Sequence, residues 1–176
     1  MPRPGAGFSV TFSVENLEHW TRRIDGADKV IFRETKLSLT SMGSHLKPLI
    51  QSKTPVDRGK LQRGISFKVE HRGSAIWELI LDVFDEQARK YALYVERGTR
   101  PHWPPIAAIT GWAERHGIPP FLVARAIAKH GTIKRFGRPG PAGAEMFGKT
   151  LDQEEGWIRG EQARLHENIV KGIVSG

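Results

Sequence analysis

In this 176-residue sequence, which has no cysteine, the side chains best suited to acid–base or metal chemistry are seven histidines. The glycine-flanked serines of SMGSH, at 41–45, lie within a helical pattern and do not form the GxSxG turn that presents a serine nucleophile. The histidines are scattered, with no HExxH motif and no close carboxylate cluster, at His19, His45, His71, His102, His116, His130 and His166. We therefore expect no enzyme activity, no cofactor and no metal site.

The segment TPVDRGKLQRGISFKV, residues 54–69, contains the glycines and lysine that a phosphate-binding loop would use. Such a loop follows a strand and begins a helix, so that backbone N–H groups point at the anion. This segment instead follows a helical pattern and leads into a strand pattern. We interpret it as a structural joint that begins at Thr54. Within it, Pro55 and Asp57 set a turn, and Gly59 permits a positive φ.

The elements that must position these residues begin with a strand and a long helix. In FSVTFSV at 8–14, apolar residues alternate with serine and threonine, which is the period of a half-buried strand. From about Glu15 to Ser52 apolar residues recur every three or four positions, which predicts helix. Gly26 is expected to interrupt this helix, and Pro48 to bend or tighten its end.

A β-hairpin is predicted to follow the joint. Ile65, Phe67 and Val69 alternate with polar residues in the first strand. HRGS at 71–74 offers a turn, and AIWELILDV at 75–83 supplies the second strand.

Three short helices are predicted after the hairpin. Apolar residues at 88–95 follow the spacing of an amphipathic helix, which RGTRPHWPP at 97–105 must end. Two further helices, at about 105–116 and 120–130, are each opened by prolines and closed by a glycine. The next stretch, 136–145, is too rich in glycine and proline to be regular, and a polar helix is expected from there to Val174.

This order of elements predicts an α+β fold, because strands and helices do not alternate as βαβ units do. We expect a small antiparallel sheet with a long N-terminal helix packed on it, a helical arm and a C-terminal helix. The length suits one domain, 1–176. Its body would comprise about 8–100 and 144–176, with an arm rich in Pro, Trp and basic residues at about 101–143.

The formal net charge is +8, and its excess is concentrated in one stretch without acidic residues. Such a field favours nucleic acid, acidic protein surfaces or anionic lipid, without choosing among them. The candidate DNA-facing or partner-facing basic residues are Arg125, Lys129, Lys134, Arg135 and Arg138.

An alternative function, nucleic-acid binding, is suggested by segment 105–138, whose two short helices and glycine-containing turn resemble a helix-turn-helix. A recognition helix needs polar residues near its N-terminus to contact bases, whereas this one begins PPFLVA. That start suits burial or docking on protein. Nonspecific phosphate contact stays open.

The beginning of the sequence lacks the apolar run of a secretory signal, and nowhere do about 18 uncharged apolar residues follow one another. We therefore expect a soluble protein with no membrane partner. The lack of cysteine is compatible with assembly in a reducing cytoplasm.

Two motifs stand in a fixed order around the predicted hairpin. The first is TPVDRGKL at 54–61, and the second is YALYVERGT at 91–99, which ends in Gly98 and Thr99. With AITGWAERHGI and LVARAIAKHGT farther on, they make residues 28–151 resemble a family of tailed-phage morphogenesis proteins. This is the family named for gene product ten of a lambdoid phage, described as tail component, neck or tail-completion protein. The family's closing RPFLRPA-like stretch is matched only loosely, around Arg138.

The resemblance implies a non-enzymatic virion subunit at the head–tail junction, assembled in the host cytoplasm. Such a subunit works as a ring of its own copies, commonly a hexamer to match the tail. Its neighbours would be the head-closure or stopper protein, the tail terminator or the tail tube. The implied position also allows nonspecific contact with DNA in the channel.

Ring contacts are heterologous, which means that one patch meets a different patch on the next copy. Interface centres favour aromatic residues and arginines. The candidate surface is therefore the arm with residues 97–100 that lead into it, together with an exposed hairpin. The candidate interface residues are Arg97, Arg100, Trp103, Trp112 and Phe121.

Overall fold

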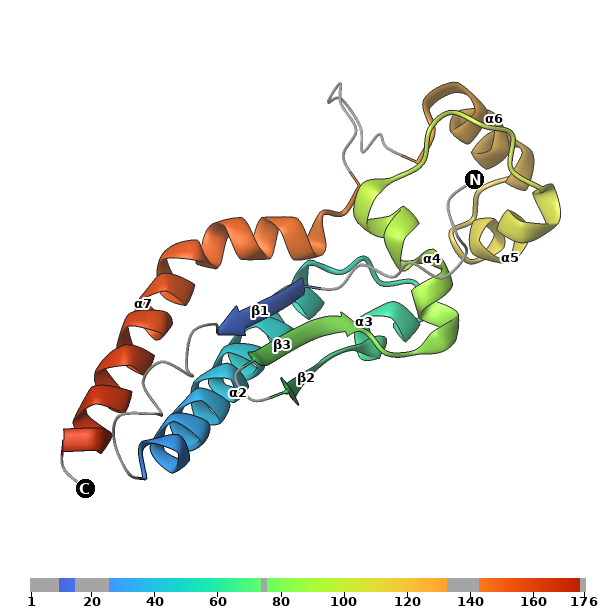
Figure 1. The fold of residues 1–176 in the computed structure, drawn as a ribbon. Helices are drawn as coiled ribbons and strands as arrows, with labels where there is room; N and C mark the ends of the chain where they lie inside the picture. Colours follow the sequence, from blue (N-terminus) through green and yellow to red (C-terminus); the bar gives the residue numbers. More distant parts are fainter. Residues whose placement is uncertain (1–9, 15–25, 74–75, 133–142, 175–176) are drawn as a thin grey trace.

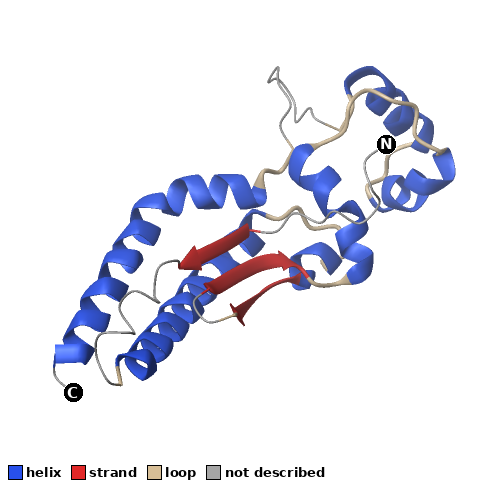
Figure 2. Cartoon of the chain, in the orientation of Figure 1, coloured by secondary structure: helices blue, strands red, loops and turns tan. Residues whose placement is uncertain are grey.

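The computed structural model describes residues 10–14, 26–73, 76–132 and 143–174, and its architecture is α+β, as the sequence predicted (Figure 1). The strands lie in the middle of the molecule, between two long helices and a group of short ones (Figure 2). The elements in chain order are β1 (Val10–Val14), α2 (Ala27–Lys53), α3 (Lys60–Gly64), β2 (Ile65–Arg72), β3 (Ile76–Val83), α4 (Glu86–Arg97), α5 (Ile106–Arg115), α6 (Pro120–His130) and α7 (Met146–Val174).

Over the described residues the sheet has three antiparallel strands in the order β1-β3-β2, so β3 is central. β2 and β3 form the predicted hairpin, in which Phe67 lies opposite Leu81 and Val69 opposite Leu79. β1 pairs with the other side of β3, with Phe12 opposite Leu79. The predicted first strand is therefore confirmed over its described residues. Within the described sheet the hairpin presents only β2 as an outer edge.

Helix α2 covers one face of this sheet (Figure 1). A Cβ at Gly43 would lie 2.3 Å from the Phe67 ring, so glycine is what lets β2 approach α2 closely. From Leu39 onward the buried α2 residues join Leu79 and Leu81 of β3 in the hydrophobic core. Apart from Gly43, the buried positions of α2 recur every three or four residues, at Ala27, Ile31, Thr35, Leu39, Met42, Leu46 and Ile50.

Helix α7 runs alongside α2, and its bounds confirm the predicted C-terminal helix (Figure 1). Phe147 at its first turn is fully buried. Farther along, the imidazole Nε2 of His45 lies 2.8 Å from a carboxylate oxygen of Glu154, and the His45 ring stacks on Trp157 with centroids 3.8 Å apart. These contacts attach the middle of α7 to α2.

Three details differ from the sequence prediction or extend it. Helix α2 begins at Ala27, directly after Gly26 at φ 82°, whereas a helical pattern was expected from Glu15; residues 15–25 lie outside the described residues. The helix contains Pro48 and continues to Lys53. The short helix α3 inside the joint was not predicted, because five residues are too few to show a helical period.

The three predicted short helices are confirmed as α4, α5 and α6, with α5 and α6 lying beyond α4 and away from the sheet (Figure 2). Pro105 and Pro119 occupy the N-cap positions of α5 and α6. Glycines with positive φ follow all three helices, at Gly98 (73°), Gly117 (65°) and Gly131 (69°).

Candidate interaction site at the root of the helical arm

The joint between α2 and β2 is fixed by two glutamine side chains that reach across it. Gln51 Nε2 donates to the backbone oxygens of Gln62 and Ile65 at 3.0 and 3.2 Å, and Gln62 Nε2 donates to the Gln51 oxygen at 3.0 Å. Gly59 precedes α3 with φ 71°, the positive value expected for it. A Cβ at Gly59 would lie 2.7 Å from the Arg63 guanidinium. The turn therefore has a defined shape.

The first residue of the joint connects α2 to the start of α7. Thr54 is buried, and its hydroxyl donates to the Ile50 oxygen at 2.8 Å and lies 3.2 Å from the sulfur of Met146. The hydroxyl thereby satisfies one of the carbonyl groups that the end of a helix leaves unpaired. Thr54 and Met146 are separated by 92 residues, so this contact joins the first motif to the last helix.

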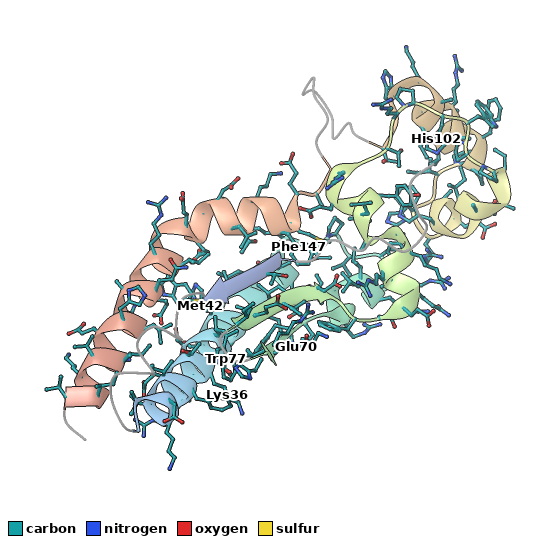
Figure 3. All side chains as sticks on the ribbon, viewed as in Figure 1. Lys36, Met42, Glu70, Trp77, His102 and Phe147 are labelled. Carbon is teal, nitrogen blue, oxygen red and sulfur yellow. The ribbon has the colours of Figure 1, made fainter. Side chains whose placement is uncertain are left out.

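Glu96 of α4 caps the same start of α7. Glu96 is 5% exposed, and its carboxylate accepts hydrogen bonds from the backbone N–H groups of Phe147 at 3.2 Å and Gly148 at 3.1 Å. Figure 3 shows Phe147 at the start of α7. Its backbone oxygen accepts from Glu145 N at 3.1 Å. A buried anion is favourable here because a helix N-terminus offers unpaired donors and a positive dipole end. The second motif therefore also converges on α7.

The chain leaves and re-enters the body at two threonines that contact each other. Thr99 N donates to the Thr132 hydroxyl oxygen at 2.8 Å, Thr132 N donates to the Thr99 hydroxyl oxygen at 3.2 Å, and the two hydroxyls are 2.9 Å apart. A Cβ at Gly131 would lie 2.1 Å from the Thr99 backbone oxygen, so only glycine fits there. Residues 100–131, which we call the arm, thus form a closed excursion.

A single ion pair connects the arm to the joint at a second place. Arg115 Nε at the end of α5 donates to Asp57 Oδ1 at 3.0 Å, and its Nη2 pairs with Asp57 Oδ2. This hydrogen-bonded guanidinium lowers the pKa of Asp57 below its ordinary value, and the carboxylate raises the pKa of Arg115. Both side chains are partly exposed, so we expect their contact to orient the arm against the joint and to add little to the free energy of unfolding.

The arm and the body line a groove of about 780 Å³, and the paired side chains Asp57 and Arg115 belong to its lining. We call it the arm groove. The turn from Pro55 to Leu61 forms one wall, Tyr91 and Val95 of α4 lie at its floor, and α5 forms the other wall. Residues of both TPVDRGKL at 54–61 and YALYVERGT at 91–99 therefore line the same groove, although at least 30 positions separate them in the chain.

The predicted interface residues lie on the exposed surface of the arm and its approach. Arg97 and Arg100 are exposed at the arm's root. Trp103 is 54% exposed and Phe121 58%, with ring centroids 5.8 Å apart in an edge contact. Trp112, on the groove side, stacks on His116 with centroids 4.1 Å apart. The structure thus brings Trp103 and Phe121 together and places Trp112 on a different face.

Two of the predicted basic residues are described, and both are exposed on α6. Arg125 and Lys129 lie one turn apart, following Phe121 at the same spacing, so the exposed face of α6 is apolar at its start and basic at its end. Lys134, Arg135 and Arg138 lie outside the described residues.

Three residues of this site, Glu96, Arg115 and Thr132, were not predicted from the sequence. A signal for Glu96 existed, because Ala88, Ala92 and Glu96 recur every four residues and place the carboxylate on the buried stripe of α4. Arg115 meets Asp57 across 58 residues and Thr132 meets Thr99 across 33, distances at which local spacing carries no information.

The described residues contain no group of three His, Cys, Asp or Glu side chains placed to hold a metal ion. None of the described helices combines the length and the apolar character needed to span a membrane.

The comparisons with known proteins give no relative for this chain. No protein-family model, no curated protein and no solved structure matches it.

Proposed function

We propose that this chain is a structural subunit of a tailed bacteriophage, a neck or tail-completion protein that works without catalysis at the head–tail junction. It assembles there as a ring of its own copies, commonly a hexamer, and contacts the head-closure or stopper protein, the tail terminator or the tail tube. The observation that carries this proposal is the arm, which is closed at Thr99 and Thr132 and exposes large apolar side chains to solvent.

The exposed apolar side chains of the arm favour an assembly role. Singly exposed apolar residues are ordinary, but six large ones within the 32 residues of the arm are a high local density, and two of them, Trp103 and Phe121, are in contact. Aromatic residues are also what buried interface centres contain. These exposed side chains are Trp103, Ile106, Trp112, Ile118, Phe121 and Leu122.

The shape of the molecule suits a heterologous contact. The arm lies at one end of the chain's fold, and α2 and α7 extend toward the other (Figure 1). An arm of one copy that binds a different surface on the next copy generates a ring when the rotation closes. A closed excursion is well suited to this, because it projects without breaking the hydrogen bonds of the sheet.

The family resemblance supports the same proposal. Its two motifs, TPVDRGKL at 54–61 and YALYVERGT at 91–99, lie together around the arm groove and at the start of α7. Their residues form the turn, the helix cap and the arm root, so they account for the architecture of the body and the placement of the arm.

A second candidate function is nonspecific nucleic-acid binding by segment 105–138, favoured by the exposed cations Arg125 and Lys129. Phe121 and Leu122, the first side chains of α6 after its proline, are both more than half exposed and apolar, which does not suit base reading. A gel-shift assay on duplex DNA at low and moderate salt tests this function. Reversing both charges would abolish a phosphate contact and reduce the salt dependence of binding.

Removal of the arm tests the proposed function. Because Thr99 and Thr132 are in contact, two glycines can replace residues 100–131 without straining the body. In the phage that encodes the chain, we expect the shortened protein to fold and the infected cells to accumulate separate heads and tails. The matched control is Lys36→Glu on α2, an exposed charge far from the arm that should leave particle assembly intact. Normal joining of heads and tails by the shortened protein would refute the proposal.

A further inference from the structure

The arm groove has the size of a ligand site and is open to solvent. Its volume of about 780 Å³ lies within the range of cavities that hold ligands of substantial size. Asp57 and Arg115, which pair with each other, both line it, so the arm and the joint are connected within the lining of the groove.

The lining of the groove is apolar and offers room for a neighbouring backbone. Leu61, Tyr91 and Val95 form its floor. On the α5 wall, Ala108 and Gly111 have almost no side chain, and a Cβ at Gly111 would meet only a nitrogen of Arg115 at 3.4 Å. A chain segment can therefore approach the α5 backbone closely and place its own apolar side chains on the floor.

The charge of the lining is positive. Arg58 and Lys60 line the groove, and neither forms an ion pair among the described residues, although Arg58 also helps to lower the pKa of Asp57; the Lys60 ammonium donates to Gln87 at 3.2 Å. Among the described lining residues Asp57 is the only acidic one, and its carboxylate is paired with Arg115. The cations of the lining therefore outnumber its acidic residues.

We propose that the arm groove binds an acidic, apolar segment of a partner protein. Apolar side chains of that segment cover the floor, and its carboxylates lie against Arg58 and Lys60. Charge complementarity selects this occupant over the arm of a second copy, whose exposed face carries the like charges Arg125 and Lys129. The inference does not depend on the proposed virion function, because binding is measured on the free chain.

Two matched peptides test the proposal. One is a dye-labelled amphipathic peptide of leucine, alanine and glutamate, and the other has lysine at every glutamate position. Their binding to the full chain is followed by fluorescence anisotropy at moderate salt. We expect the acidic peptide to bind at least about tenfold more tightly than the lysine peptide, since like charges oppose the latter.

Three variants test whether the acidic peptide binds in the arm groove. Ala108→Trp fills the groove from an exposed helix position, and we expect it to weaken the acidic peptide at least about tenfold. The pair Arg58→Glu and Lys60→Glu should weaken it by about fivefold or more. The control pair Lys29→Glu and Lys36→Glu reverses two exposed charges on α2 and should change little. Unchanged melting temperatures verify that all three variants fold.

Several results would overturn the proposal. Equal affinity for the two peptides, full affinity in the Ala108→Trp variant, or equal loss in the α2 control pair would each show that the groove does not select acidic segments. Self-association that Ala108→Trp abolishes, with no peptide binding, would assign the groove to a second copy. Tighter binding of a single-stranded oligonucleotide that displaces the acidic peptide would assign it to nucleic acid.

Discussion

Thr99 and Thr132 hold the two ends of the arm together through reciprocal contacts, with each backbone N–H donating to the hydroxyl oxygen of the other, at 2.8 and 3.2 Å. The two residues are 33 positions apart in the chain. Their contact closes the root of the arm, and the Asp57–Arg115 pair is a second, partly exposed connection to the body.

Replacing these threonines should reveal their coupling. We predict that Thr99→Val and Thr132→Val each lower the free energy of unfolding by about 1 kcal/mol, because each removes hydrogen bonds from the same pair. The double variant should lose less than the sum of the single ones, as contacting residues do. Urea denaturation measures all three. Thr40→Val, whose exposed hydroxyl bonds only within α2, is the control and should be close to neutral. Fully additive losses would contradict the coupling.

The cap formed by Glu96 should be sensitive to its charge. We predict that Glu96→Gln lowers the free energy of unfolding by about 1 to 3 kcal/mol, because a glutamine offers one acceptor to the two N–H groups of Phe147 and Gly148. Hydrogen exchange should quicken first at those two amides. The control, Glu86→Gln on the exposed side of α4, should change stability by about 0.5 kcal/mol or less. Unchanged exchange at α7 would show that the carboxylate is not its cap.

Substitutions at two glycines can distinguish the cost of backbone strain from the cost of steric contact. Gly117 and Gly131 have nearly the same positive φ, 65° and 69°, but a Cβ meets nothing within 4 Å at Gly117 and the Thr99 oxygen at 2.1 Å at Gly131. Gly117→Ala should therefore cost only the strain of the left-handed conformation, about 1 kcal/mol. Gly131→Ala should cost clearly more, because the arm root must shift as well. Equal melting temperatures for the two variants would contradict the close approach at the root.

The contribution of the Asp57–Arg115 contact to stability should decrease as the pH falls. A carboxyl group whose pKa is lowered in the folded state contributes stability above its unfolded pKa, and this contribution is lost as the pH falls through the folded pKa. Asp57 is such a group, because the Arg115 guanidinium lowers its pKa. We predict that the Asp57 carboxyl carbon titrates below the ordinary aspartate range in an NMR pH series.

Arg115→Gln supplies the matched comparison for this titration. Removing the guanidinium should return the pKa of Asp57 toward its ordinary value and loosen the arm at the groove, while the Thr99–Thr132 root stays closed. A pKa of Asp57 that is the same in both proteins would show that the two side chains are not paired in solution.

Local patterns in the sequence predicted most of the fold. The alternation of Ile65, Phe67 and Val69 and the amphipathic spacing at 88–95 each correspond to an observed element, because burial on one face imposes its period on the sequence. The glycines that end α4, α5 and α6 also mark their helices correctly, since a positive φ is costly for other residues.

Contacts between residues far apart in the chain could not be predicted from local sequence patterns. Asp57 was predicted to set a turn and lies in a bend before α3, yet nothing near it indicates that its partner is Arg115 in the arm. The pairing of β1 with β3 and the convergence of Thr54 and Glu96 on the start of α7 likewise depend on how the elements pack. Spacing determines an element and its buried face, whereas a site assembled from three elements is determined by tertiary structure.

We propose that this chain acts as one of several identical copies at the junction of a phage head and tail. Electron microscopy of intact particles of the phage that encodes it, with the chain identified by a specific antibody label, tests this proposal. We predict a closed ring of copies at the head–tail junction. Absence of the chain from complete particles, or its presence only as a solitary subunit elsewhere, would contradict the claim.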